Sequence, residues 1–301
     1  MKLLTFVEHG EHRLGIVTDD GVVDVKAASE LVTDAADVPH DVHDVIAGGV
    51  QALEALRRLA DAVAADQAAF ADAVKLEDEL RLLPCVTRPS KIICVGLNYR
   101  KHAEETNAPI PHAPILFNKF SNALAGHMEE VPLPRTSNAV DYEAELAIVI
   151  GKEAKYVERA DALNYVFGYC NANDLSARDL QMRTSQWLTG KSCDKFAPLG
   201  PYLATADEVG NPNALEIKCT VNGEVRQRSN TSDMIFHCDE LVSYISQHMT
   251  LVPGDIILTG TPEGVVLGLP EEQRMYLKDG DIVTIEIEKL GTLTNKMVAE
   301  A

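Results

Sequence analysis

The sequence is short of basic residues. Its 301 residues include 27 lysines and arginines against 46 aspartates and glutamates, which gives a formal net charge of -19 at pH 7. A charge of this sign repels nucleic-acid phosphates and anionic lipid headgroups, so we expect neither nucleic-acid nor membrane partners. An anionic substrate would need positive charge supplied locally, by a metal ion or by a few lysines and arginines.

The sequence also has no CxxC pair, and we expect neither a leader nor a membrane span. The six cysteines are scattered without a CxxC pair, which favours a reducing compartment. The first apolar run meets an acidic residue at Glu8, so we expect no signal peptide. No stretch approaches the roughly 20 apolar residues that cross a bilayer. With 46% hydrophobic and 24% charged residues, the sequence predicts a globular, cytoplasmic protein.

Two prolines mark an expected boundary in the chain. Residues 2–25 alternate as three short strands, and the Ala-rich residues 41–83 are typical of helix. Pro84 and Pro89 then bracket an extended crossing. We therefore predict a small N-terminal α/β domain, residues 1–84, and a main domain, residues 85–301.

Short apolar runs separated by turns fill the predicted main domain. The expected strands outnumber the helices, so the predicted class is α+β with a β-rich, mixed main domain. The strongest turn signal is Asn222-Gly223, which predicts a hairpin over residues 215–228. Further strands are expected at residues 91–96, 115–119, 165–173, 256–258 and 281–288, and a helix at residues 239–248.

Residues 141–151 place two carboxylates on one face of a predicted strand. Side chains alternate along a strand, so Glu143 and Glu145 point the same way, and Ala147 and Val149 continue that face. An ionised acid buried in a covered interior destabilises the fold by several kcal/mol unless a cation or hydrogen-bond donors pair with it. A hard divalent metal ion would meet them. A strand that begins at a solvated edge and becomes buried further along would give the same pattern.

A helical turn after residue 98 would bring a histidine and a glutamate together. If Asn98 caps this turn, His102 and Glu105 lie at i and i+3, where the carboxylate fixes the imidazole tautomer and raises its basicity. The pair would form a general-base dyad, although an ordinary surface helix has the same spacing. The proline-rich residues 109–114 that follow would let this segment act as a lid.

Other candidate residues follow predicted strands or a glycine. Asp174 opens a polar turn after an apolar strand, the position of a third carboxylate ligand or of a helix N-cap. Lys119 ends a strand, either facing a pocket or solvated. Lys191 follows a glycine near the only tryptophan and is a candidate cation for the site.

The order of these motifs resembles that of the fumarylacetoacetate hydrolase family. The match runs from about Lys91 to the C-terminus, roughly two thirds of the chain. It consists of GLNYRKHAEE, DYEAELAIVIGK, NANDLSARDLQ, residues 187–191, VNGE and ILTGTPEGV, in that order. Ordered motifs are far more specific than any one of them.

The resemblance implies a metal site and a catalytic pair. Glu143, Glu145 and Asp174 would bind one divalent ion, Mg or Mn, because these hard ions prefer all-oxygen ligation. His102 and Glu105 would form a water-activating dyad on a closing lid.

The resemblance also implies further site residues and an assembly. Lys191 matches the catalytic lysine of the family. Substrate-binding roles are implied for Arg178, Gln181 and Thr261, and less securely for Lys119. The family's members are commonly dimers, so we expect a homodimer.

The resemblance implies a small anionic 2-oxo or diketo acid as substrate. The intact dyad favours hydrolytic cleavage of a C–C bond in a 2,4-diketo acid, as in acylpyruvate or fumarylacetoacetate. Isomerisation of 2-hydroxyhepta-2,4-diene-1,7-dioate (5-carboxymethyl-2-hydroxymuconate) and decarboxylation of an oxaloacetate-type acid are the alternatives. The alternative outside the enzymes is a protein that binds a 2-oxo acid without converting it. The N-terminal segment resembles that of the family's longer branch, and each motif occurs once.

Overall fold

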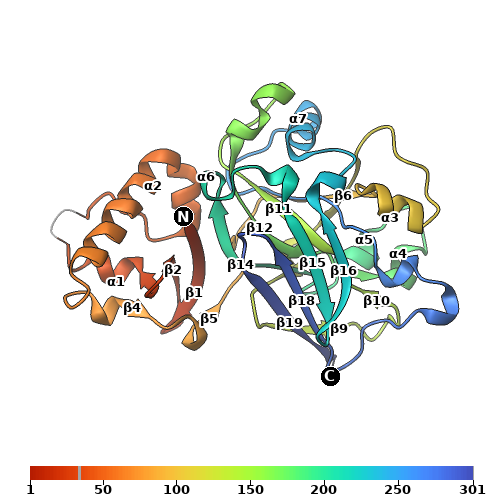
Figure 1. Ribbon diagram of the computed structural model, residues 1–301, viewed down its shortest axis with the longest axis horizontal. Coiled ribbons are helices and arrows are strands. Elements are labelled where there is room, and N and C mark those ends of the chain that lie inside the picture. The colour runs from red at the N-terminus through yellow and green to blue at the C-terminus, as the bar shows by residue number, and fades with distance from the viewer. Residues whose placement is uncertain (33–34, 301) are drawn as a thin grey trace.

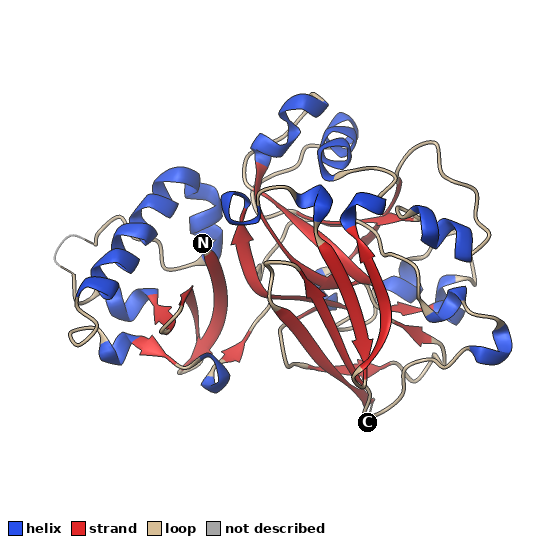
Figure 2. Cartoon of the chain, viewed as in Figure 1, coloured by secondary structure: helices blue, strands red, loops and turns tan. Residues whose placement is uncertain are grey.

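The computed structural model describes residues 1–32 and 35–300, and its largest element is a sheet that runs through most of the molecule (Figures 1 and 2). Its strands are Lys2–Glu8 (β1), Glu11–Thr18 (β2), Gly21–Asp24 (β3), Val74–Lys75 (β4), Arg81–Leu82 (β5), Ile92–Gly96 (β6), Ile115–Lys119 (β7), Leu124–Ala125 (β8), Ala144–Ile150 (β11), Val166–Asn173 (β12), Ala197–Thr205 (β14) and Ile256–Leu258 (β17). They follow the order β4-β3-β2-β1-β14-β12-β11-β17-β6-β7, with β5 beside β1 and β8 beside β14.

A second sheet packs over one face of the first. Its strands are Glu130–Leu133 (β9), Glu216–Val221 (β15), Glu224–Asn230 (β16), Ile282–Ile287 (β18) and Thr292–Ala299 (β19), in the order β16-β15-β18-β19-β9. Val140–Asp141 (β10) and Ser176–Ala177 (β13) pair separately. The predicted hairpin is confirmed as β15 and β16, and Asn222 and Gly223 take the positive φ of 53° and 82° that a tight turn requires.

The helices are few and mostly short. They are Val25–Ser29 (α1), Val42–Ala65 (α2), Arg100–Glu105 (α3), Arg178–Gln181 (α4), Leu188–Lys191 (α5), Ala206–Val209 (α6) and Cys238–His248 (α7). Figure 1 shows α2 over the N-terminal strands and α3, α4 and α5 at the opposite end of the molecule. Within the described residues, no helix has the length and apolarity to cross a membrane. Large sheets with few helices confirm the predicted α+β, β-rich class.

The N-terminal prediction is right for the strands and half right for the helix. β1, β2 and β3 form the expected antiparallel meander. Helix α2 ends at Ala65, so the predicted helix is wrong for residues 66–83. In that segment β4 pairs with β3 and β5 pairs with β1. Pairing with a formed sheet therefore overrides the helix propensity of the Ala-rich sequence.

The N-terminal strands continue the main sheet. β1 pairs with β14, Lys2 opposite Ala204 and Leu3 opposite Leu203. The predicted division between residues 84 and 85 therefore crosses a hydrogen-bonded sheet, and as a domain boundary it stays a prediction.

Strand β11 is buried on both faces. Leu146, Ile148 and Ile150 belong to the core shared with the second sheet. Ala147 and Val149 belong to the core that continues toward α2. The predicted alternation is therefore present, and the burial of both faces explains why this strand is apolar almost without interruption.

Candidate active site

Three acidic side chains converge where β11 begins and β12 ends. Ala144 is paired with Asn173, so Glu143 and Asp174, which flank the pair, are neighbours, and the Asp174 amide donates to the Glu143 carbonyl at 2.9 Å. Glu145 follows one strand repeat later. One oxygen from each of the three carboxylates lies within 4.8 Å of the others, and all three residues are buried. The solvated-edge alternative therefore does not describe this segment.

Two cations neutralise part of this acidic cluster. The Lys191 ammonium, at the end of α5, donates to Glu143 Oε2 at 2.7 Å and to Asp174 Oδ2 at 2.9 Å. The Arg178 guanidinium, at the start of α4, lies 2.7 Å from Glu143 Oε1 and donates to Asp141 Oδ2 at 2.9 Å. Such pairing is required because these charges are buried.

The two glutamates differ in pKa. Burial alone raises the pKa of Glu143, but the attraction of Lys191 and Arg178 outweighs it and lowers that pKa to about 2. Burial, and then repulsion by Asp174 and Glu143, raise the pKa of Glu145 well above its usual range. Glu145 Oε2 accepts from the Gly260 amide at 2.7 Å, but no basic side chain of the described residues pairs with Glu145. The raised pKa therefore marks Glu145 as the carboxyl group of the cluster that lacks a cationic partner among the described residues.

The donor set of the cluster fits a divalent cation. Glu145 lacks a cationic partner among the described residues, so a cation held between it and the neighbouring carboxylates would supply the charge that the cluster lacks. All three groups offer oxygen, the donor that Mg and Mn prefer. Metal binding requires ionised carboxylates, so it would oppose the raised pKa of Glu145.

Lys119 lies behind the acidic cluster. Its ammonium donates to the carbonyls of Leu175, Lys191 and Phe196 at 2.9, 2.5 and 2.7 Å. Nζ also lies 2.7 Å from Asp174 Oδ1, which therefore receives positive charge but no hydrogen bond. Lys119 is 2% exposed, so its predicted substrate contact does not fit this position. The structure gives it a role beneath Asp174 instead.

The predicted His–Glu pair forms on α3. His102 Nδ1 lies 2.8 Å from Glu105 Oε1. The predicted cap is wrong, because Tyr99 occupies the N-cap position and the Asn98 amide group bonds instead to the backbone around β17 and before α7. When the carboxylate accepts Nδ1–H, the neutral ring presents its lone pair at Nε2. Nε2 has no hydrogen-bond partner within the described residues.

The loop after β17 holds Glu105 in place. The Gly264 amide donates to Glu105 Oε2 at 2.9 Å. Gly268 packs directly on the carboxyl group, since a Cβ at this position would lie 2.5 Å from Glu105 Cδ and 2.7 and 2.9 Å from its oxygens. The sequence implied only a substrate-binding role for Thr261 in this loop and gave no sign of its support for the dyad.

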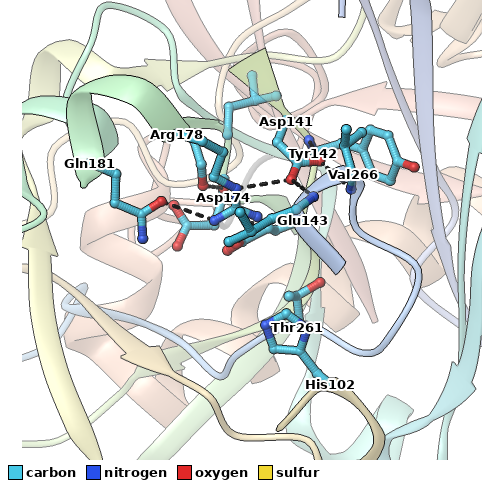
Figure 3. Close-up of polar contacts among 12 residues, drawn as sticks. His102, Asp141, Tyr142, Glu143, Asp174, Arg178, Gln181, Thr261 and Val266 are labelled. Carbon is cyan, nitrogen blue, oxygen red and sulfur yellow. Dashed lines mark hydrogen bonds and ion pairs between the residues drawn. The ribbon is translucent and has the colours of Figure 1, made fainter. Parts of the chain in front are cut away.

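A cavity of about 730 Å³ adjoins these groups. In Figure 3, His102 and Thr261 lie on one side, across from Glu143, Arg178 and Gln181. Of the residues predicted for the site, those that line the cavity are His102, Glu105, Glu143, Glu145, Arg178, Gln181, Lys191 and Thr261. Asp174, like Lys119, lies beneath the surface of the cavity.

Asp141 is a site residue that the sequence analysis missed. It is fully buried and accepts from Arg178 and from the amides of Val266 and Leu267, at 2.9 and 3.0 Å (Figure 3). It therefore joins the cation beside Glu143 to the loop after β17. A usable signal was present, because Asp141 precedes Glu143 by two residues in an alternating segment.

An aromatic wall of the cavity was also missed. Phe117 and Trp187 meet edge to face with centroids 5.3 Å apart, and the Lys191 ammonium lies 5.0 Å from the Phe117 ring centre. Trp187 packs against Gly96, where a Cβ would lie 2.6 Å from the indole. A glycine at this strand end therefore gives the tryptophan room, a requirement that sequence spacing does not reveal.

The chain is similar to known proteins over the segment that builds this site and beyond. A family model described as "Fumarylacetoacetate (FAA) hydrolase C-terminal" matches residues 91–298. The "Oxaloacetate tautomerase FAHD2A, mitochondrial" of Bos taurus is 51% identical over 222 residues, which are 73% of this chain and 70% of that protein.

Solved structures resemble the whole chain. One is a 5-carboxymethyl-2-hydroxymuconate delta-isomerase from Mycobacterium smegmatis, with a TM-score of 0.75 and 33% identity. Another is a maleylpyruvate hydrolase from Sphingobium sp. SYK-6 in complex with manganese(II) ion and pyruvate, with a TM-score of 0.77 and 31% identity. Each comparison covers 100% of both chains.

Proposed function

The chain belongs to the fumarylacetoacetate hydrolase family, and from that premise we propose that it is an enzyme that interconverts the keto and enol forms of a small, oxaloacetate-type 2-oxo acid. The observation that supports this most is that the His102–Glu105 pair and the acidic cluster adjoin one cavity. The 51% identical relative is named an oxaloacetate tautomerase, which favours this reaction over others of the family.

We propose that Glu143, Glu145 and Asp174 hold one divalent ion, Mg or Mn. When bound, such an ion supplies Lewis-acid polarisation of the 2-oxo group of the substrate. The all-oxygen donors support the assignment, as does the lack of a basic partner for Glu145 among the described residues. So does the manganese in the structurally similar maleylpyruvate hydrolase.

His102 moves the proton in this proposal. Nε2 removes a proton from C3 of the keto acid, the C–H electron pair becomes the C2=C3 double bond, and the carbonyl pair moves to O2, which takes a proton from water. The hydroxide that remains accepts the proton from Nε2, which restores the neutral imidazole and balances the reaction. Glu105 accepts a hydrogen bond from Nδ1–H and stabilises the imidazolium that forms. Lys191 and Arg178 supply positive charge near the developing oxyanion.

Hydrolysis of a C–C bond in a 2,4-diketo acid, the reaction that the sequence analysis placed first, is the second candidate. The same Nε2 lone pair would remove a proton from an attacking water. The cavity volume favours this reaction, since about 730 Å³ exceeds what a four-carbon acid requires. The similar maleylpyruvate hydrolase supports it as well.

One comparison of substrates tests both candidates. Enol-oxaloacetate and acetylpyruvate are each added to the protein with Mg, with Mn or with EDTA, and the loss of ultraviolet absorbance and the release of pyruvate are followed. The proposal expects metal-dependent tautomerisation that falls at least 100-fold in His102→Gln. Turnover of acetylpyruvate alone would support the hydrolase, and turnover of neither would overturn both reactions.

Assembly, compartment and domain division are part of the same proposal. We keep the homodimer, which light scattering of the purified protein tests. The six cysteines are unpaired in the structure, which suits a reducing compartment, and a cytoplasmic location remains our proposal although the Bos taurus relative is named mitochondrial. We also keep the division into two domains, residues 1–84 and 85–301. Limited proteolysis tests it, since cleavage near the boundary should release two stable fragments.

A further inference from the structure

The charged groups that line the cavity are almost all paired. Lys191 contacts Glu143 and Asp174, Arg178 contacts Glu143, and His102 contacts Glu105. The remaining cation of the lining is Arg274, which makes no ion pair with any carboxylate of the described residues.

Arg274 is held at the cavity by its own loop. It follows the short turn Glu271–Gln273 (η8), and its Nε donates to the Leu269 carbonyl at 2.9 Å. The side chain is half-buried, and Nη1 and Nη2 have no partner within the described part of the chain. Two neighbouring N–H groups of a guanidinium match the two oxygens of a carboxylate.

The loop that presents Arg274 is connected to the acidic cluster. Asp141 accepts from the Val266 and Leu267 amides and from Arg178, which lies against Glu143 (Figure 3). Leu267 and Leu269 line the cavity between that anchor and Arg274. Arg274 therefore stands on a segment tied by hydrogen bonds to the reaction site.

We propose that Arg274 binds the distal carboxylate of a dicarboxylic 2-oxo acid and so sets the preference for dicarboxylates. This inference rests on the proposed function, in which the ion held by the acidic cluster would polarise the 2-oxo group and the distal carboxylate has no assigned partner. A second carboxylate would enter a cavity lined by Glu105, Glu143 and Glu145, in a chain whose net charge is -19. Only a cation without an acidic partner offsets that repulsion, and Arg274 meets this condition.

Binding of two matched probes tests the proposal without turnover. 2-Oxoglutarate and 2-oxopentanoate have the same chain length, but a methyl group replaces the distal carboxylate in the second. Trp187 is the only tryptophan and lines the cavity, so its fluorescence reports the Kd of each probe in the presence of Mn. The variants are Arg274→Gln and Arg274→Lys, and the control is Arg183→Gln. Arg183 is exposed and lies outside the cavity lining, and its substitution removes the same charge from the protein.

The expected result is a selective loss. Arg274→Gln should raise the Kd of 2-oxoglutarate at least tenfold, because a charge-assisted hydrogen bond is lost. The Kd of 2-oxopentanoate should change less than twofold. Arg274→Lys should fall between, and Arg183→Gln should match the wild type. An equal loss for both probes, no loss, or a wild type that does not prefer the dicarboxylate would overturn the proposal.

Kinetics separate this inference from the proposed function. In Arg274→Gln the KM for oxaloacetate should rise at least tenfold with kcat changed less than threefold, while phenylpyruvate, which has no distal carboxylate, should be unaffected. A wild type with no tautomerase activity but with the Arg274-dependent probe preference would contradict the proposed reaction and keep the subsite. A wild type with tautomerase activity but without the Arg274-dependent probe preference would support the proposed reaction and contradict the subsite.

Discussion

Gly268 should control catalysis through the position of Glu105. In Gly268→Ala, the new Cβ would lie 2.5 Å from Glu105 Cδ, whereas ordinary contact begins near 3.4 Å. The carboxyl group must therefore move by about 1 Å. The backbone of Gly268 has no positive φ, so alanine itself causes no conformational strain there.

The size of the effect follows from the two hydrogen bonds that Glu105 makes. They measure 2.8 Å to His102 and 2.9 Å to the Gly264 amide, and a shift of about 1 Å takes both beyond hydrogen-bond range. A charge-assisted hydrogen bond contributes about 1.5–3 kcal/mol, so kcat should fall by about 10- to 100-fold. Thermal stability should change little, because Glu105 is partly exposed and can move aside.

The assay is kcat for enol-oxaloacetate in Gly268→Ala, Glu105→Gln and the double variant. If Gly268 acts through Glu105, the second substitution should add less than threefold to the first. Fully additive losses, or an unchanged kcat in Gly268→Ala, would refute the reasoning. Melting temperatures serve as the control for folding.

The other predictions concern the metal, a buried ion pair and pH. Mn should raise the melting temperature of the wild type but not of Glu145→Gln, since a ligand that binds only the folded state stabilises it; an equal rise in both would contradict the assignment of this ligand. Asp141→Asn should lower the free energy of unfolding by about 3–5 kcal/mol in urea titrations, because it leaves Arg178 buried without its full partner; a loss under about 1 kcal/mol would contradict this account. Burial, then Arg88, lower the pKa of His43, so the fold favours the neutral ring; the stability this contributes is complete above pH about 6.5 and is lost as pH falls through the lowered pKa. When the pH is lowered from 7.5 to 5.5, the urea midpoint of unfolding should therefore decrease less in His43→Gln than in the wild type. Equal decreases in the two proteins would rule out His43 as the cause.

Much of the fold could be predicted where local pattern and tertiary environment agree. The hairpin at Asn222-Gly223 and the alternation of β11 are such cases, because turn chemistry and the two-residue period are local properties. Residues 66–83 could not be predicted, since their strands exist only by pairing with β1 and β3. Local propensity carries no information about such partners.

The site shows the same division. Glu143 and Glu145 follow from strand alternation, but the convergence of Asp174 depends on the pairing of β11 with β12. Lys119 was expected at a pocket and instead points beneath Asp174, because three carbonyls from separate segments enclose its ammonium. Arg274 gave no signal at all, since only the cavity reveals that its neighbours leave it unpaired.

The pairing of β1 with β14 has a consequence for truncation. β14 is bonded to β12 on one side and, near its end, to Lys2 and Leu3 on the other. Removing residues 1–84 would leave the backbone amides and carbonyls of that margin open to water and to other molecules, the condition under which sheets recruit foreign strands. Strand β1 thus protects this edge of β14 from pairing with other chains. We therefore expect a protein shortened by residues 1–84 to aggregate even if its catalytic residues keep their positions.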